Sequence, residues 1–220
     1  MIEGLCLSCH AEAERKAEEA RRRLALRLRL IALGGGEKPY REFRFETYQV
    51  TPDNQSAFVR AKNFNPNRDN LYLWGPCGVG KTHLAFAIVR RSCEAGYTVE
   101  FLKPPQLMRK VRRKDPDEEQ HAIDRFVRAD VFALDDLGIG QETAYARQIF
   151  QEILDGRHYA YRAGLVVTSK FSPGDLARKL DDDTTVSRLA GMCQVVEVRG
   201  KDHRLTAQLT AADPARDKGV

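Results

Sequence analysis

The chain has 220 residues, which is enough for one α/β domain with a sizeable core and a short appendage. Hydrophobic residues make up 42% and charged residues 30%, a composition that is ordinary for a soluble globular protein. The 36 Lys and Arg against 31 Asp and Glu give a net charge of +5, which permits contact with nucleic acid without demonstrating it.

Membrane-spanning and secreted classes are not favoured. No apolar run reaches the roughly eighteen residues that a transmembrane helix needs. The N-terminal region carries acids and arginines where a secretory signal would have an apolar stretch. The cysteines are odd in number and scattered, a pattern that suits reduced thiols better than a disulfide framework. We therefore expect a cytoplasmic protein.

The N-terminal part predicts one amphipathic helix over residues 11–33, ended by the glycines at 34–36. Its apolar positions recur at three- and four-residue steps: Ala13, Ala17, Ala20, Leu24, Leu28 and Ile31. Such a helix is too small to fold alone, so its stripe should dock on the following domain or on a partner. We expect a basic helical extension over 1–36, a main domain over 37–209 and a flexible tail over 210–220.

Cys6 and Cys9 form a short Cys-x-x-Cys pair followed by His10. A haem attachment is excluded because no export signal accompanies the pair. A closed structural zinc site needs four ligands, and this pair supplies half of them. Two interpretations stay open, namely a zinc ion shared with another chain or with an upstream pair, and ordinary reduced thiols.

The main domain shows short apolar runs that predict buried strands, with helical segments such as 81–94 and 142–161 between them. The expected strands are Leu71–Trp74, Thr98–Leu102, Val131–Leu134, Leu165–Thr168 and Val195–Val198. Short apolar strands that alternate with helices indicate an α/β fold with a parallel sheet sandwiched by helices.

One glycine-rich loop between a predicted strand and a predicted helix fits the P-loop pattern G-x-x-x-x-G-K-[ST] at every fixed position. It consists of Gly75, Pro76, Cys77, Gly78, Val79, Gly80, Lys81 and Thr82. Glycines let the backbone N–H groups point inward at phosphates, and the helix that follows adds the positive end of its dipole. Lys81 should bind the phosphates of ATP and Thr82 should ligate Mg²⁺. We expect His83, beside this ATP-binding set, to pack or cap in the helix.

Two acids, Asp135 and Asp136, follow the apolar run Val131–Leu134. Alone this pattern is weak, because strands often end in solvated acids. Paired with a P-loop it indicates a Walker B element. Asp135 would then hold Mg²⁺ through water, and Asp136 would orient or deprotonate the attacking water.

At this point the chain resembles the DnaC/DnaI/IstB group of AAA+ ATPases over residues 40–205. The motifs that carry the resemblance are Gly80-Lys81-Thr82-His83-Leu84, Leu134-Asp135-Asp136-Leu137-Gly138, Val166-Val167-Thr168-Ser169, Ser187-Arg188-Leu189-Ala190-Gly191-Met192 and Gly200-Lys201-Asp202-His203-Arg204. The resemblance implies a RecA-like core with a small or absent lid. It also implies ATP-dependent head-to-tail assembly, in which Arg188, or failing it Arg204, is the arginine finger that acts on the neighbouring subunit's ATP.

Two positions depart from the family pattern. Lys170 stands where the family commonly has Asn, so that Lys170 would contact the γ-phosphate, or Thr168 or Ser169 would position the water. Asp136 stands where many members have Glu, and its shorter side chain implies slow hydrolysis. We count Lys81, Asp136, Arg188, Ser169 and Lys170 as the candidate catalytic residues.

The segment 103–114 holds six cations and no acid. By resemblance to helicase loaders and initiators it is expected to contact single-stranded DNA through Lys103, Arg109, Lys110, Arg112, Arg113 and Lys114. The alternative is a solvated helix face balanced by the acids that follow it. No aromatic residue is interleaved in the segment, so base stacking is not indicated.

The motifs bear on four functions. A helicase loader, which holds a replicative helicase and single-stranded DNA together, is placed first, and the helix over 11–33 is its expected helicase contact by resemblance. A close second is the IstB-like ATPase of a transposition system, which acts with a transposase on duplex DNA. A P-loop kinase for small molecules is disfavoured, because Ser187-Arg188-Leu189 follows the Walker B element. The fourth is a nucleotide-gated adaptor without useful hydrolysis.

Overall fold

The computed structural model describes residues 7–35, 40–113, 115–140 and 143–203. The chain divides into two compact units, Met1–Arg41 and Glu42–Val220. Among the residues that the structure describes, no helix combines the length and the apolar character that crossing a membrane requires.

The first unit is built on one long helix, α1 (Leu7–Leu30). At 1.5 Å per residue its 24 residues span roughly 36 Å. The helix begins four residues before the predicted start, and a π-helical turn, η1 (Ile31–Gly35), follows it directly. Gly34 and Gly35 therefore belong to a π-helical turn that continues the helix, instead of ending it. Leu24, Leu28 and Ile31, which belong to the predicted apolar stripe, are exposed.

The second unit contains a five-stranded parallel sheet in the order β2-β3-β4-β1-β5. The strands are β1 (Leu71–Trp74), β2 (Val99–Leu102), β3 (Val131–Leu137), β4 (Leu165–Ser169) and β5 (Gln194–Glu197). All five predicted strands are present. β3 runs three residues beyond its prediction and takes in both acids of the Walker B element.

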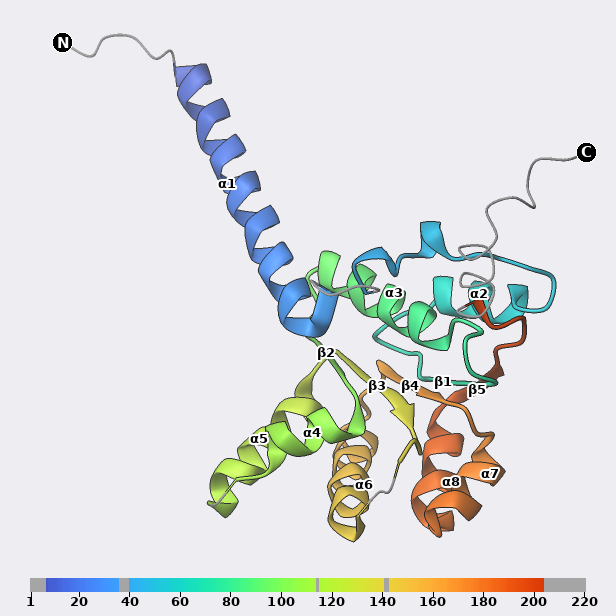
Figure 1. Ribbon diagram of the computed structural model, residues 1–220. Coiled ribbons are helices and arrows are strands. Elements are labelled where there is room, and N and C mark those ends of the chain that lie inside the picture. The colour runs from blue at the N-terminus through green and yellow to red at the C-terminus, as the bar shows by residue number, and fades with distance from the viewer. Residues whose placement is uncertain (1–6, 36–39, 114, 141–142, 204–220) are drawn as a thin grey trace, which may run out of the picture. The chain divides into compact units, whose positions relative to one another are not determined.

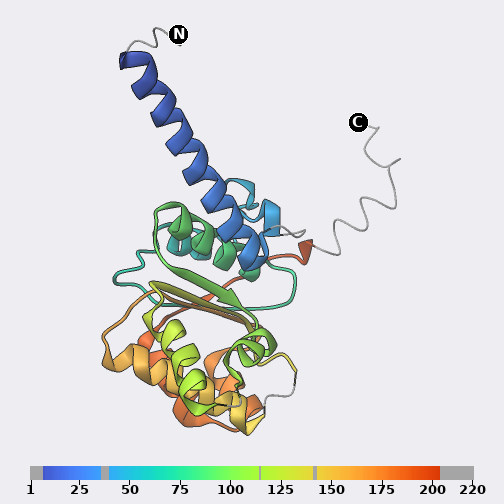
Figure 2. The same cartoon turned by 90° about the vertical axis from the view of Figure 1, so that its left-hand side faces the viewer.

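Helices cover both faces of this sheet (Figures 1 and 2). One face carries α2 (Gln55–Lys62) and α3 (Lys81–Glu94). The other carries α4 (Pro104–Val111), α5 (Pro116–Arg128), α6 (Ala144–Tyr159), α7 (Pro173–Leu180) and α8 (Asp183–Met192). Two short 3₁₀ turns, η2 (Tyr40–Glu42) and η3 (Phe45–Thr47), precede α2. The described residues after β5 are 198–203, and no separate lid occurs among them.

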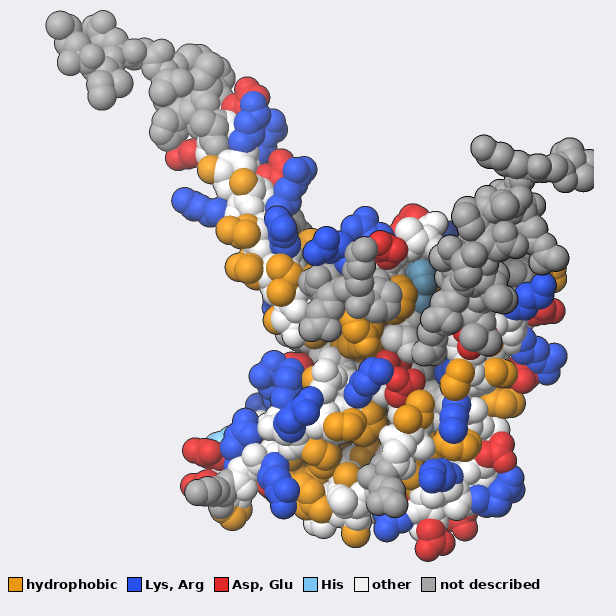
Figure 3. All heavy atoms as spheres, viewed as in Figure 1, with side chains coloured by type: hydrophobic (Ala, Val, Ile, Leu, Met, Phe, Trp, Pro, Cys, Tyr) orange, Lys and Arg blue, Asp and Glu red, His pale blue; other side chains and the backbone are white. Residues whose placement is uncertain are grey.

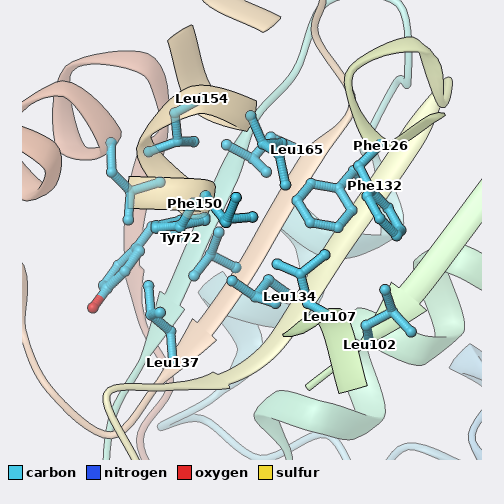
Figure 4. Close-up of a cluster of buried hydrophobic side chains, with 14 of the residues drawn as sticks. Tyr72, Leu102, Leu107, Phe126, Phe132, Leu134, Leu137, Phe150, Leu154 and Leu165 are labelled. Carbon is cyan, nitrogen blue, oxygen red and sulfur yellow. The ribbon is translucent and has the colours of Figure 1, made fainter. Parts of the chain in front are cut away.

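The central strands β1, β3 and β4 are buried along nearly their whole length because helices cover both faces of the sheet. On the face of α4 to α8, one buried cluster contains Phe132 and Leu134 of β3, Leu165 of β4 and Tyr72 of β1 (Figure 4). The helices complete this cluster with large apolar side chains such as Phe126 and Phe150. Burial of this kind, at about 25 cal/mol per Å² of apolar surface, supplies most of the driving force for folding.

Strand β4 lies between β1 and β3, so the P-loop strand and the Walker B strand are not neighbours. Because all strands are parallel, the carboxyl ends of β1, β3 and β4 meet at one edge of the sheet. A ligand that binds at this edge therefore meets residues from three strands.

The C-terminus of α6 carries a tyrosine where glycine is the common choice. Tyr161 has a φ of +51° and is 96% exposed. Its N–H donates to His158 O at 3.0 Å, and the N–H of Arg162 donates to Arg157 O at 2.8 Å. These are the two hydrogen bonds of a Schellman motif, whose left-handed position favours glycine because a Cβ atom is strained there.

We expect Tyr161→Gly to stabilise the protein by about 1 kcal/mol, since the strain is removed and little contact is lost. The free energy of unfolding in urea measures this directly. Tyr159→Gly is the matched control, because Tyr159 is 72% exposed but lies within the helix. There glycine should destabilise by about 0.5 kcal/mol. A lower urea midpoint for Tyr161→Gly would contradict the assignment.

Candidate nucleotide-binding site

The P-loop connects the end of β1 to the start of α3. Gly75, Gly78 and Gly80 have φ values of +146°, +75° and +96°, a region that L-residues rarely adopt. Close neighbours add a second constraint. A Cβ atom on Gly75 would lie 2.2 Å from the Val198 carbonyl oxygen, and one on Gly80 would lie 2.7 Å from the Tyr48 ring. The loop thus has no room for side chains at these glycines.

Lys81 begins α3, and its side chain turns back onto the loop that precedes it. Its Nζ donates to Gly75 O at 2.8 Å and to Pro76 O at 2.6 Å. The side chain is buried against the loop, so the ammonium lies where the loop curls around. A phosphate bound by the loop would receive these protons in place of the carbonyls.

Two elements bring polar side chains onto Asp135, which is fully buried. Its Oδ1 accepts from Thr82 Oγ1 of α3 at 2.8 Å and from Thr168 Oγ1 of β4 at 2.7 Å. Burial raises the pKa of Asp135, and the nearby charge of Asp136 raises it further, while the two hydroxyl bonds oppose the shift. A buried carboxylate of this kind is stabilised by a cation.

These groups fit Mg²⁺, which prefers hard oxygen ligands and is commonly bound through one or two carboxylates plus phosphates. Asp135 Oδ2 is buried and has no hydrogen-bond partner within the described ranges. The Thr82 hydroxyl is bonded to the same carboxylate and provides a second oxygen. Within those ranges no group of three or more His, Cys, Asp or Glu side chains could hold a metal ion. Waters and the phosphates of a nucleotide, which are common ligands of Mg²⁺, would supply the remaining oxygens.

Asp136 sits at an irregularity of β3. Its φ is +63°, and the register between β3 and β4 shifts between Leu134 and Leu137. The backbone N–H of Asp136 donates to Thr168 Oγ1 at 2.9 Å, so one threonine bridges both acids of the Walker B element. The left-handed residue turns the two successive carboxylates toward the same edge of the sheet.

The sequence groups Lys103 with the cations of segment 103–114, whereas the structure places it beside Asp136. Its Nζ lies 2.6 Å from Asp136 Oδ2 and 3.8 Å from Asp135 Oδ2, and its side chain is 42% exposed. The reason is topological, because Lys103 follows β2, and β2 is the neighbour of β3 in the sheet. Lys103 therefore lies beside both acids of the predicted Walker B element, a position that the run of cations in the sequence did not indicate.

The polar residues at the end of β4 divide into two groups. Thr168 contacts the acids, whereas Ser169 is buried, donates to Leu137 O at 2.8 Å and accepts from the N–H of Phe171 at 3.1 Å. Lys170 is exposed, and its Nζ lies 4.8 Å from the centre of the Phe171 ring. Of the residues considered for positioning water, Thr168 is the one in contact with both acids.

His83 packs against the segment that precedes α2. Its ring stacks on Phe43 with centroids 4.6 Å apart and meets the Tyr48 ring edge-on at 5.1 Å. Its Nε2 donates to Arg44 O at 2.7 Å. Burial lowers the pKa of His83, which favours the neutral ring. Tyr48 also donates through its hydroxyl to Val79 O at 3.3 Å. The segment before α2 is therefore hydrogen-bonded to the P-loop.

The candidate arginine finger, Arg188, lies on α8 and forms an ion pair with Asp155 of α6. Both side chains are partly exposed. The second candidate, Arg204, lies outside the described residues, as do Cys6 and Lys114. The side chain of Cys9 is likewise not described, and zinc binding at this pair stays a prediction.

The basic segment after β2 forms α4 and the turn that follows it. Figure 3 shows Lys and Arg side chains over α4 and α5. Lys110 lies 3.5 Å from Glu100, and the Arg112 guanidinium lies 5.8 Å from the centre of the Tyr145 ring. Tyr145 belongs to α6, so an aromatic residue joins this surface from a distant part of the sequence. No signal within the segment itself could have revealed it.

The motif resemblance is confirmed by comparison with known proteins. A family model described as IstB-like ATP binding protein matches residues 7–211. The ATP-binding protein of insertion sequence IS5376 from Geobacillus stearothermophilus is 25% identical over 190 residues, 82% of this chain and 74% of the relative. The replicative helicase loader DnaC of Buchnera aphidicola is 25% identical over 169 residues, 71% of this chain and 69% of the relative.

A solved structure supports the fold. The crystal structure of the DnaC helicase loader matches with a TM-score of 0.62 at 23% identity, covering 74% of this chain and 100% of that chain. The α/β parallel-sheet prediction is confirmed by this likeness and by the sheet itself. With a family model that covers most of its length, the chain belongs to the IstB-like ATP-binding family and is a P-loop ATPase of the AAA+ class.

Proposed function

We propose that this protein is the ATPase subunit of a transposition system, which assembles on duplex DNA with ATP and recruits a transposase. The observation that carries the proposal is the convergence of Lys81, Thr82, Asp135 and Asp136 at one sheet edge, in a chain of the IstB-like family. The relative from an insertion sequence supports the transposition setting. The sequence motifs favour a helicase loader, and the IstB-like family model is our reason for proposing the transposition ATPase ahead of it.

In this proposal the P-loop N–H groups bind the ATP phosphates, and Lys81 moves from the loop carbonyls onto them. Thr82 and Asp135 would hold Mg²⁺, which would supply positive charge to neutralise the phosphates. Asp136 accepts a proton from the attacking water or orients it, and the Thr168 hydroxyl fixes the backbone of that acid. Lys103 must leave Asp136 for this carboxylate to act as a base.

We further propose that each site is completed by the neighbouring subunit. Head-to-tail contacts bring one surface of a subunit onto a different surface of the next. Arg188 would then stabilise the charge that develops on the neighbour's γ-phosphate during transfer. Asp155 holds its guanidinium within the free subunit.

The DNA contact in this proposal is the basic surface of α4 and its C-terminal turn, formed by Arg109, Lys110, Arg112 and Arg113. Cations that neutralise phosphates give a salt-dependent affinity without sequence preference. On this surface the Arg112 guanidinium lies over the Tyr145 ring, so that a cation and an aromatic side chain are presented together.

A helicase loader is the second candidate, and the similarity to DnaC of Buchnera aphidicola favours it. The two functions differ in the DNA that ATP-bound subunits should prefer. A transposition ATPase should assemble on duplex DNA, and a loader should assemble on single strands beside a hexameric helicase.

We expect ATP-bound protein to bind a duplex at least about tenfold more tightly than a single strand of equal length at 100 mM salt, measured by fluorescence anisotropy. Preference for the single strand would favour the loader.

Arg109→Glu with Arg113→Glu should weaken duplex binding by on the order of tenfold or more and flatten its salt dependence. Arg178→Glu with Lys179→Glu on α7 is the control with equal charge change. Equal loss in both double variants would contradict the assigned surface.

A further inference from the structure

The chain returns across the P-loop after β5. The N–H of Val198 donates to Trp74 O at 2.7 Å, directly before the loop, and the N–H of His203 donates to Gly78 O at 3.1 Å, in its middle. Residues 198–203 thus lie against the loop that should hold the phosphates, although they come from the far end of the described chain.

This segment brings a carboxylate onto the loop. A Cβ atom on Gly78 would lie 1.8 Å from Asp202 Oδ1 and 2.0 Å from its Cγ. The Asp202 carboxylate therefore fills the space beside the Gly78 Cα, and its side chain is only partly exposed. The pattern is unexpected for a phosphate site, because an anion of the protein occupies the neighbourhood of a loop built to attract anions.

We propose that Asp202 is an internal anion that holds the nucleotide-free phosphate loop and is displaced when ATP binds, so that residues 200–203 move with the nucleotide state. The inference rests on the proposed ATP site at Gly75–Thr82. The loop N–H groups and the N-terminus of α3 attract negative charge, and in the absence of phosphates a nearby carboxylate benefits from this field.

Bound phosphates reverse the sign of this interaction. Like charges a few ångströms apart repel each other strongly where solvent is partly excluded. The Asp202 carboxylate must then withdraw, and the backbone bond from His203 to Gly78 is strained or broken with it. ATP binding is thereby coupled to the position of the chain that follows β5.

Asp202→Asn tests the inference in the full-length protein. Fluorescence of Trp74, the one tryptophan of the chain and the residue before the P-loop, can report binding of Mg·ATP and of tripolyphosphate. We expect Asp202→Asn to bind both ligands more tightly, by on the order of tenfold at low salt, with a smaller gain at high salt. Asp117→Asn on α5 removes the same charge from an exposed position and should leave both affinities unchanged.

Other outcomes contradict the inference. Unchanged affinity overturns it, and weaker ATP binding with unchanged tripolyphosphate binding would mean that Asp202 accepts a hydrogen bond from the ribose. Lys81→Ala distinguishes failure of the ATP site from failure of the role of Asp202. If that variant still binds ATP, the proposed site fails. If it loses binding while Asp202→Asn matches the unmodified protein, only the role of Asp202 fails.

Amide hydrogen exchange gives a second measurement that needs no substitution. The His203 N–H is bonded to Gly78 O in the structure and should exchange slowly without nucleotide. With saturating Mg·ATP we expect its exchange to accelerate by about tenfold or more. Unchanged or increased protection would overturn the displacement of this segment.

Discussion

Replacing Lys81 with alanine will weaken ATP binding by on the order of a hundredfold or more, while the nucleotide-free protein keeps its fold. The ammonium lies within the curl of the P-loop. It donates to the carbonyl oxygens of Gly75 and Pro76 at 2.8 and 2.6 Å. The loop offers dipoles to the phosphates, and this side chain adds a full positive charge inside the loop.

Thermal unfolding with and without Mg·ATP measures the loss, because a ligand that binds only the folded state raises its melting temperature. The unmodified protein should show this rise, and Lys81→Ala should show none at the same ATP concentration. Lys179→Ala, which removes an exposed cation from α7, should behave as the unmodified protein. A full ATP-dependent rise in Lys81→Ala would refute the assigned site.

Asp136→Asn will lower the rate of ATP hydrolysis by roughly a hundredfold to a thousandfold, with ATP affinity retained. An amide cannot take a proton from water, although its size and shape match the carboxylate. Thr82 and Thr168 donate to Oδ1 of Asp135, the acid proposed to hold Mg²⁺, and not to the Asp136 side chain. Binding and hydrolysis should therefore respond to different acids.

The measurement is steady-state phosphate release at saturating ATP, together with a binding assay. Asp124→Asn on α5, where the acid pairs with Arg128 at the surface, is the matched control and should leave the rate unchanged. A rate loss below about threefold would exclude Asp136 as the base. Loss of ATP affinity instead would place Asp136 in the binding site.

The sequence predicted the sheet well because the central strands β1, β3 and β4 are buried on both faces and begin as apolar runs, although β5 is partly exposed. β1 and α3 match their predicted bounds, and the P-loop lies between them as the pattern requires. β3 was predicted too short, since periodicity alone cannot show that a strand continues through two acids. Its continuation depends on Asp136 adopting a left-handed conformation, which is paired with a register shift against β4.

The side chains of the site were less predictable because they depend on which strands are neighbours. In the sequence Lys103 belongs to a run of cations. In the fold its Nζ forms an ion pair with Asp136, because β2 lies beside β3. Tyr145 joins the basic surface from α6, more than thirty positions after Arg112. Asp202 reaches Gly78 only through the return of the chain after β5. Contacts of this kind are set by the tertiary fold and leave no local pattern.

The proposed role of Arg188 involves a second subunit, because its guanidinium would act on the ATP of its neighbour. Within the subunit its guanidinium is paired with Asp155, an arrangement that also fits a purely structural ion pair. Loss of activity in Arg188→Ala alone would not separate a finger from a structural residue, because both predict a defect.

Mixing two inactive variants makes that separation. Arg188→Ala subunits keep their own Lys81 and Asp136 but lack the finger, and Asp136→Asn subunits keep the finger but lack the base. In an equal mixture roughly a quarter of head-to-tail contacts would pair an intact site with an intact finger, so ATPase activity should return to about that fraction. If no activity returns at any mixing ratio, although both variants fold and bind ATP, the shared site is contradicted.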